Sequence, residues 1–91
     1  MSAWRTARRA LIAGRVQGVF FRDAVRVEAE RAGVSGWAAN RNDGRVEAWL
    51  EGDPAAVERL VAWCRDGAPG RVESVDVEVA EPEGLNGFEV R

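Results

Sequence analysis

The sequence predicts an α+β sandwich in which two helices cover one face of an antiparallel sheet. Three observations support this fold class. Alternating and amphipathic segments follow one another in the order strand, helix, strand, strand, helix, strand, and a short last strand. Glycine and proline separate the segments, and 91 residues suffice for one domain spanning 1–91.

In the first half, a strand is expected at about 6–13, and two glycines bracket the loop that follows, Gly14 to Gly18. A helix is expected at about 21–32, because apolar residues recur there at helical spacing, and Gly33 stands where a left-handed cap belongs. The apolar positions of this helix are Phe21, Val25, Ala29 and Ala32. The pattern therefore predicts one buried helical face.

The next two strands are expected at about 35–40 and 45–51, joined by the tight turn Asn42-Asp43-Gly44. Asp53-Pro54 is a typical helix start, with a capping carboxylate before a proline. The second helix has a buried stripe of Val57, Leu60, Val61 and Cys64. A fourth strand alternates Val75, Val77 and Val79 with acids, 82–87 form a loop, and 88–91 form the short last strand.

This order of elements is typical of a ferredoxin-like sandwich. Strands one and two are then parallel and joined by a right-handed crossover over the first helix. Their carboxyl ends lie at the same edge of the sheet. The topology therefore predicts that the Gly14–Gly18 loop, the start of the first helix and Asn40 lie close together.

Composition excludes several kinds of chemistry. All 13 basic residues are arginine, so a lysine Schiff base, a Walker-type lysine, a histidine base and a histidine metal ligand are all ruled out. A lone cysteine, Cys64, forms no internal disulfide, and its spacing predicts a buried helix residue. The longest apolar run near the N-terminus is Ala10 to Ala13, too short for a signal or membrane segment. We expect a cytoplasmic protein with no membrane partner.

Charge is unevenly distributed along the chain. The net charge is −2, but residues 1–45 carry nine arginines against four acids, and residues 46–91 carry four against eleven. A positive surface in the first half suits a small anion or a nucleic acid, whereas a solvated mixed surface is the ordinary alternative.

The segment Gly14-Arg15-Val16-Gln17-Gly18-Val19-Phe20-Phe21-Arg22 is the strongest chemical signal. A glycine-bracketed turn that opens a helix can direct successive backbone N–H groups at one phosphate-sized anion. Arg22 is placed to bind two oxygens of the same anion. By itself, such a loop is as often an ordinary strand–helix turn. It matches neither a dinucleotide fingerprint nor a Walker loop.

Asn40 ends the second strand, where asparagine is usually a turn former. Its functional interpretation depends on the topology that places it beside the anion loop.

Together the two segments resemble the acylphosphatase family. The first motif of that family, G-x-V-Q-G-V-x-F-R, matches Gly14 to Arg22 at every fixed position. The second, G-aromatic-x-x-N-x-x-D-G-x-V with a later glycine, matches the second and third strands, and the chain ends in a family-like Gly87-Phe88-Glu89-Val90-Arg91. The residues matching the second motif are Gly36, Trp37, Asn40, Asp43, Gly44, Val46 and Gly52. One departure is Ala39, where many members carry a basic residue.

The resemblance implies an enzyme that hydrolyses acyl phosphates to a carboxylate and inorganic phosphate, with no metal and no cofactor. It implies that Arg22 binds the phosphate and that Asn40 positions the attacking water. The phosphate cradle falls on the backbone of Arg15, Val16, Gln17, Gly18, Val19, Phe20 and Phe21. The substrate is then a small molecule, and we expect a monomer.

Residues outside this scheme have ordinary expected roles. Gln17 shapes the loop, and Arg41 and Arg45 flank a hairpin in solvent. Packing is expected of four aromatic residues: Phe20, Trp37, Trp49 and Phe88.

Two alternatives remain at this point. RNA-recognition domains use the same sandwich, but the third strand here is acidic with a single aromatic residue, so no nucleic-acid partner is expected. The second alternative is an acylphosphatase-like domain that serves a larger carbamoyl-transfer protein.

Overall fold

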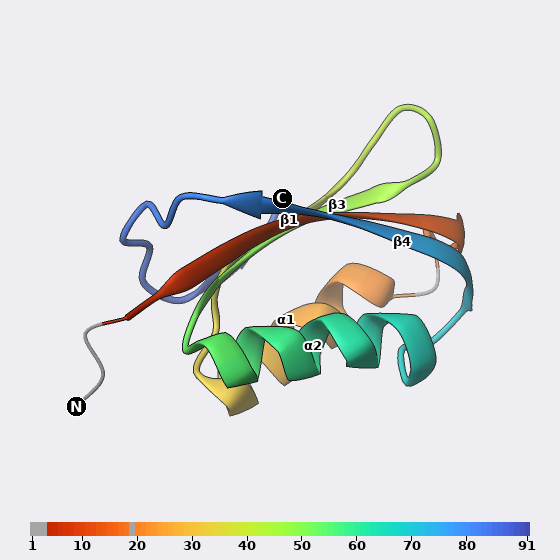
Figure 1. Cartoon of the computed structure of the whole chain (residues 1–91). Coiled ribbons are helices and arrows are strands. Elements are labelled where there is room, and N and C mark those ends of the chain that lie inside the picture. Colours follow the sequence, from red (N-terminus) through yellow and green to blue (C-terminus); the bar gives the residue numbers. More distant parts are fainter. Residues whose placement is uncertain (1–3, 19) are drawn as a thin grey trace.

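The computed structural model describes residues 4–18 and 20–91. A single five-stranded sheet has both helices on one of its faces (Figure 1). The elements in chain order are β1 (Thr6–Arg15), α1 (Phe21–Ala32), β2 (Ser35–Asn40), β3 (Val46–Gly52), α2 (Pro54–Asp66), β4 (Arg71–Ala80) and β5 (Phe88–Val90). The predicted element order is confirmed, and the bounds of α1 and β2 agree with those expected from the sequence.

Strand order across the sheet is β4-β1-β3-β2-β5. Both β1 and β2 pair antiparallel with the strand between them, β3, so β1 and β2 run parallel to each other as predicted. The short β5 joins parallel to β2, which makes the sheet mixed rather than wholly antiparallel. As a result, the end of β1 and the hairpin after β2 lie at the same end of the sheet, on the right in Figure 1.

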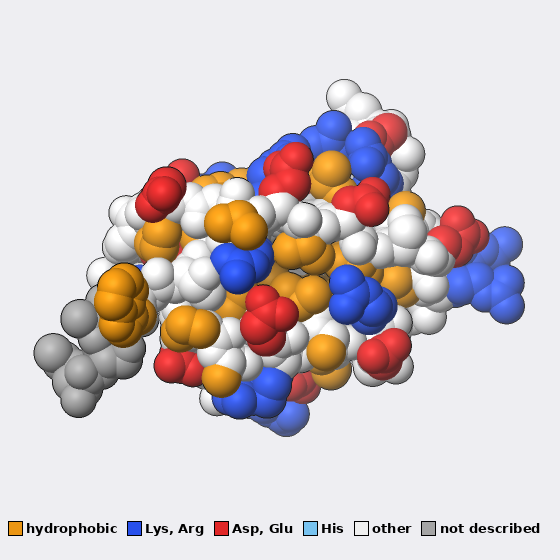
Figure 2. Space-filling view, in the orientation of Figure 1, with side chains coloured by type: hydrophobic (Ala, Val, Ile, Leu, Met, Phe, Trp, Pro, Cys, Tyr) orange, Lys and Arg blue, Asp and Glu red, His pale blue; other side chains and the backbone are white. Residues whose placement is uncertain are grey.

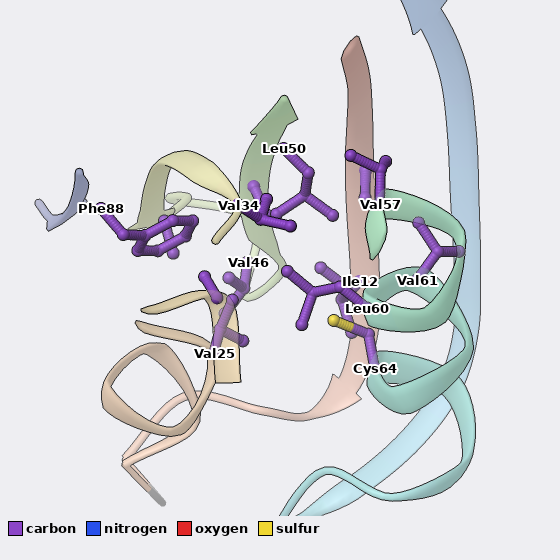
Figure 3. Packing of buried hydrophobic residues seen from close by; sticks show 14 of the residues in the cluster. Ile12, Val25, Val34, Val46, Leu50, Val57, Leu60, Val61, Cys64 and Phe88 are labelled. Carbon is purple, nitrogen blue, oxygen red and sulfur yellow. The ribbon is translucent and has the colours of Figure 1, made fainter. Parts of the chain in front are cut away.

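Side chains from the sheet and from both helices meet in one apolar core. Figure 3 shows Ile12 of β1 and Leu50 of β3 between Val25 of α1 and Leu60 of α2. The predicted stripe of α2 is buried in full, and its Asp53 cap accepts a hydrogen bond from the Ala56 N–H at 3.2 Å. Its cap and its stripe thus fix where α2 begins and which face it buries.

One predicted buried position is wrong, and one alternating strand is only partly covered. Ala32 was expected on the buried face of α1, but only Phe21, Val25 and Ala29 are buried there. Ala32 is the last residue of α1, next to the left-handed Gly33, and it is exposed. On β4 the alternating Val79 is 81% exposed. This strand is at the sheet edge, and the core reaches only its first half, where Val72 and Val75 pack.

A close approach of two strands explains Gly14. Its φ of +126° lies in the region that favours glycine, and a Cβ there would stand 2.1 Å from the main-chain oxygen of Arg71. The β1–β4 register shifts between Ala13 and Gly14, so the glycine sits at an irregularity that turns the end of β1.

A buried carboxylate closes the other end of the sheet. Glu51 of β3 is fully buried and accepts five hydrogen bonds. Three come from successive backbone N–H groups of residues 83–85, in the loop that joins β4 to β5. The remaining two come from the Arg5 guanidinium and the Trp49 ring. The carboxylate thereby holds that loop against the sheet (the blue loop at the left of Figure 1).

No helix in the described part of the chain has the length and apolar character needed to cross a membrane.

Candidate active site

Among the described residues of the loop between β1 and α1, Gly18 at φ +75° and Phe20 at φ +58° are left-handed. Alternation of left-handed residues along a loop turns backbone N–H groups to one side, which is the geometry of an anion-binding concavity. Val16 at the start of the loop is buried and anchors it to the core. Val19, which the sequence assigns to the cradle, lies outside the described residues.

The N-terminus of α1 has no side-chain cap. Its capping residue is Phe20, which makes no side-chain hydrogen bond to the first turn, whereas Asp53 caps α2 with its carboxylate. The first backbone N–H groups of a helix have no partner within the helix, and the helix dipole makes this end positive. The N–H groups of the first turn of α1 therefore favour an external anion.

A pocket of about 330 Å³ opens at this helix end, and Arg22 forms part of its wall. Its charged residues are Arg22 and Asp23, and its other walls are apolar or glycine. The carboxylate of Asp23 opposes a bound anion, so attraction must come from the guanidinium and the helix end. The lining residues are Val16, Gly18, Phe20, Phe21, Arg22, Asp23 and Val90.

Arg22 is held from one side by the end of the chain that follows β5. Its Nη1 donates a hydrogen bond of 2.6 Å to the main-chain oxygen of Arg91. The Arg91 N–H in turn donates to the main-chain oxygen of Ala38 in β2 at 2.8 Å. This chain of contacts orients the guanidinium, and it ties Arg22 to the strand that ends at Asn40.

Gln17 joins the loop to the β2–β3 hairpin. Its Nε2 donates to the main-chain oxygens of Arg41 at 2.8 Å and Arg45 at 3.0 Å. The expectation that Gln17 shapes the loop is thus confirmed, and the loop and the hairpin are joined as the topology predicted.

Asn40 is exposed at the end of β2. It lines a shallow hollow formed with the next three residues, Arg41, Asn42 and Asp43, and is absent from the lining of the pocket at Arg22. The structure thus brings the loop and the hairpin together, but it places the two predicted catalytic side chains in separate hollows.

Arg41 and Arg45 do not simply project into solvent. Both pair with Asp43, and Arg41 also pairs with Glu47 at 3.2 Å. Hydrogen bonds from the Arg45 side chain and backbone hold the pKa of Asp43 well below its usual range. Figure 2 shows the resulting mixture of basic and acidic side chains over the hairpin, at the top right. The charges of Arg41 and Arg45 are therefore largely neutralised within the hairpin, whereas Arg22 has no carboxylate partner among the ion pairs of the described residues.

Sequence reasoning missed two residues of the pocket, Asp23 and Val90. Asp23 follows Arg22 directly in the sequence, so its place beside the predicted site could have been inferred from the sequence. Val90 comes from β5, and only the parallel pairing of β5 with β2 brings it here. Arg15 is exposed at the end of β1 and does not line the pocket.

Cys64 is excluded as a nucleophile by its burial. Burial raises the pKa of the Cys64 thiol to about 12, and Figure 3 shows this side chain pointing into the core. A thiol with that pKa is protonated at neutral pH and is no nucleophile.

Phe88 packs in the core as expected, whereas Phe20, for which packing was predicted, is 81% exposed. The reason is its left-handed backbone, which directs the ring away from the core.

The fold is that of a ferredoxin-like α+β domain, and a pocket with an arginine in its wall lies at the uncapped N-terminus of its first helix. The family model for acylphosphatases matches residues 8–90. An acylphosphatase of Rubrobacter xylanophilus is 58% identical over 94 residues, covering 99% of this chain and 84% of that protein. One of Gloeobacter violaceus is 56% identical over 80 residues, covering 87% of this chain and 86% of that protein.

Solved structures agree with this assignment. The crystal structure of acylphosphatase from Bacillus subtilis superposes with a TM-score of 0.90 at 36% identity, covering 94% of this chain and 98% of that one. Full-length HypF matches at 21% identity with a TM-score of 0.89, over all of this chain and 12% of that protein, which shows the shared fold. This chain belongs to the acylphosphatase family. It is a hydrolase of acyl phosphates, the carboxyl–phosphate anhydrides that the family cleaves.

Proposed function

We propose that Arg22 and the backbone N–H groups of residues 15–21 bind the phosphate of an acyl phosphate, and that Asn40 orients the attacking water. The observation that carries this proposal is the uncapped start of α1 with Arg22 in its first turn, opening on a pocket of about 330 Å³. Helix N–H groups and a guanidinium are the donors that phosphate oxygens accept from best.

The chemistry needs little from the protein beyond position and charge. The leaving group of an acyl phosphate is a carboxylate, a weak base that departs without a strong general acid. Phosphoryl transfer requires mainly alignment of the nucleophile and stabilisation of charge on the three non-bridging oxygens. This demand fits a chain with no histidine and with a cysteine buried away from the pocket.

In this scheme the Arg22 guanidinium stabilises the negative charge of the phosphate group as that charge is redistributed during hydrolysis. A guanidinium has five N–H donors, and the bond to Arg91 occupies one of them. The others remain for phosphate oxygens. Because the Arg91 contact restricts the side chain before substrate arrives, less conformational entropy is lost on binding.

Asn40 holds the water through its amide, which both donates and accepts hydrogen bonds. Gln17 supports this placement. Its Nε2 donates a hydrogen bond to the main-chain oxygen of Arg41, the residue after Asn40, and so joins the loop to the hairpin. We propose further that a phosphate oxygen of the substrate accepts the proton of the water. Asp23 is the single carboxylate residue in the pocket lining. Val19 belongs to the proposed cradle by sequence alone.

Hydrolysis of benzoyl phosphate in the presence of a metal chelator tests the proposal. The wild type should release benzoate at an undiminished rate with chelator present. Arg22→Gln should lose about 10²–10³ in kcat/KM together with affinity for inorganic phosphate, as for removal of one charge-stabilising donor.

Arg26→Gln is the matched control, because Arg26 lies one turn further along α1 and pairs with Glu30 at 3.4 Å in solvent. Its kcat/KM should stay within about twofold of the wild type. Equal losses in the two variants would refute the assigned role of Arg22.

We propose in addition that the chain acts as a cytoplasmic monomer. Light scattering coupled to size-exclusion chromatography tests the oligomeric state. A mass near 20 kDa, twice the 10.0 kDa of the chain, would contradict it.

A further inference from the structure

Phe20 combines two features that packing does not explain. Its ring is 81% exposed, and its backbone is left-handed, with φ +58° and ψ +28°. In the described part of the chain, every other residue with positive φ is a glycine. A bulky residue in this conformation is uncommon, and such outliers gather at ligand sites.

The exposed ring stands at the pocket that contains Arg22. Phe20 is part of the pocket lining, two residues before the arginine, and Val90 from β5 contributes a second apolar wall. The pocket thus has one strongly cationic group and an apolar region beside it. Its volume of about 330 Å³ falls within the range of small-ligand sites.

We propose that Phe20 and Val90 form the subsite for the acyl group, and that the preferred substrates are acyl phosphates with an aromatic or bulky apolar acyl group. This inference rests on the proposed phosphate site at Arg22. A single bridging oxygen joins the phosphorus to the acyl carbon. An acyl group therefore begins within two bonds of the phosphorus, and the neighbouring apolar surface is the surface it meets.

Contact with Phe20 stabilises such an acyl group for two reasons. The exposed ring loses apolar surface to water when a second apolar group covers it. Two aromatic rings gain further from their offset or edge-to-face arrangement. An acetyl group is too small to cover the ring, so it profits much less.

The experiment compares kcat/KM for benzoyl phosphate and for acetyl phosphate, and its readout is the ratio of the two values. Asparagine and glycine both accept the left-handed backbone. Phe20→Asn and Phe20→Gly therefore remove the ring while leaving the loop conformation accessible. Changes in the phosphate cradle affect both substrates alike and cancel in the ratio.

The ratio of benzoyl to acetyl phosphate should fall about five- to tenfold in both variants, the size expected for loss of one aromatic contact. Phe20→Trp, which keeps an aromatic surface, should retain the ratio. Val79→Asn serves as the matched control, because Val79 is also 81% exposed but lies on β4 opposite Arg8, away from the pocket. It should leave the ratio unchanged.

A ratio within twofold of the wild type in Phe20→Asn and Phe20→Gly would overturn the acyl subsite, even with the phosphate site intact. The affinity for inorganic phosphate, measured as competitive inhibition, reports on that site separately. If Arg22→Gln keeps its phosphate affinity and its rate, the proposed function fails and the subsite fails with it.

Discussion

Glu51 offers the sharpest test of the structure away from the site. The change is Glu51→Gln, which keeps the shape of the side chain and replaces one carboxylate oxygen by an NH₂ group. Oε1 accepts from two donors and Oε2 from three. The donors are the Trp49 ring and Glu83 N–H at Oε1, and Arg5, Gly84 N–H and Leu85 N–H at Oε2.

The magnitude follows from those donors. An amide nitrogen accepts no hydrogen bond, so at least two of the five donors lose their acceptor, whichever way the amide is turned. The five hydrogen bonds are partly buried, and each donor that loses its acceptor costs about 1–3 kcal/mol, which gives a loss of about 2–6 kcal/mol in the free energy of unfolding. Domains of this size are stable by about 5–15 kcal/mol. Even the smaller loss should lower Tm by about 10 °C.

Thermal or urea unfolding at pH 7 measures the loss. Glu78→Gln is the matched control, since Glu78 is 68% exposed and pairs with Arg9 at 3.0 Å on the surface. This control should change the free energy of unfolding by less than about 0.5 kcal/mol. A loss below about 1 kcal/mol in Glu51→Gln would refute the reasoning, because it would mean that the five contacts do not hold the 83–85 loop in solution.

The same contacts set a pH dependence. Burial alone raises the pKa of Glu51, but hydrogen bonds from the Glu83 N–H, Trp49, Arg5 and the Leu85 N–H outweigh it and lower the pKa from 4.5 to about 2. A carboxyl with a depressed folded pKa stabilises the fold fully above its unfolded pKa, and this stabilisation disappears as pH falls through the folded value. The stability difference between wild type and Glu51→Gln should therefore be constant above about pH 5 and shrink toward pH 2.

Two further predictions concern the site and its support. Asn40→Ala should abolish turnover of benzoyl phosphate yet leave the affinity for inorganic phosphate within about twofold, because the amide holds water and the phosphate is held elsewhere; full hydrolysis by this variant would exclude the role. Gly14→Ala should lower the free energy of unfolding by at least about 2 kcal/mol, since the new methyl group would meet the Arg71 oxygen at 2.1 Å with φ at +126°. Unfolding in urea checks the second prediction, and a wild-type midpoint would contradict it.

Local signals predicted much of the fold. The bounds of α1 follow from the period of Phe21, Val25 and Ala29, and Gly33 ends the helix in the left-handed conformation that was expected. Asp53 caps α2 in the predicted way. These features depend on residues within one or two turns of each other, so the chain pattern contains the information needed.

The candidate site residues also divide into those that are close together in the chain and those that only strand pairing brings together. Gly18, Phe21 and Arg22 are brought to one pocket as expected, because a loop and the helix that it opens are adjacent in the chain. The pocket wall formed by Val90 was not predictable, because β5 pairs with β2 across about fifty residues of sequence.

Local sequence patterns did not predict the solvent exposure of several side chains. Val79 belongs to an alternating strand, but it lies in the second half of β4, at the sheet edge, which the core does not reach. Phe20 reads as core by residue type, but its backbone conformation turns it to solvent. Glu51 alternates with the apolar residues of β3, and its side chain is nevertheless completely buried.

The sequence by itself determined the order and type of the elements, the loop that opens α1, and the choice of Arg22 as a candidate, since each depends on residues close together in the chain. The choice of Asn40 depended on the predicted topology and on the resemblance to the acylphosphatase family. Only the tertiary structure decided how the sheet edge, the 83–85 loop and the pocket walls are covered. Burial of Glu51 requires the 83–85 loop to fold over β3, and the pocket at Arg22 requires β5 to dock beside β2. Solvent access is a property of what the rest of the chain places over a residue, and no local pattern contains it.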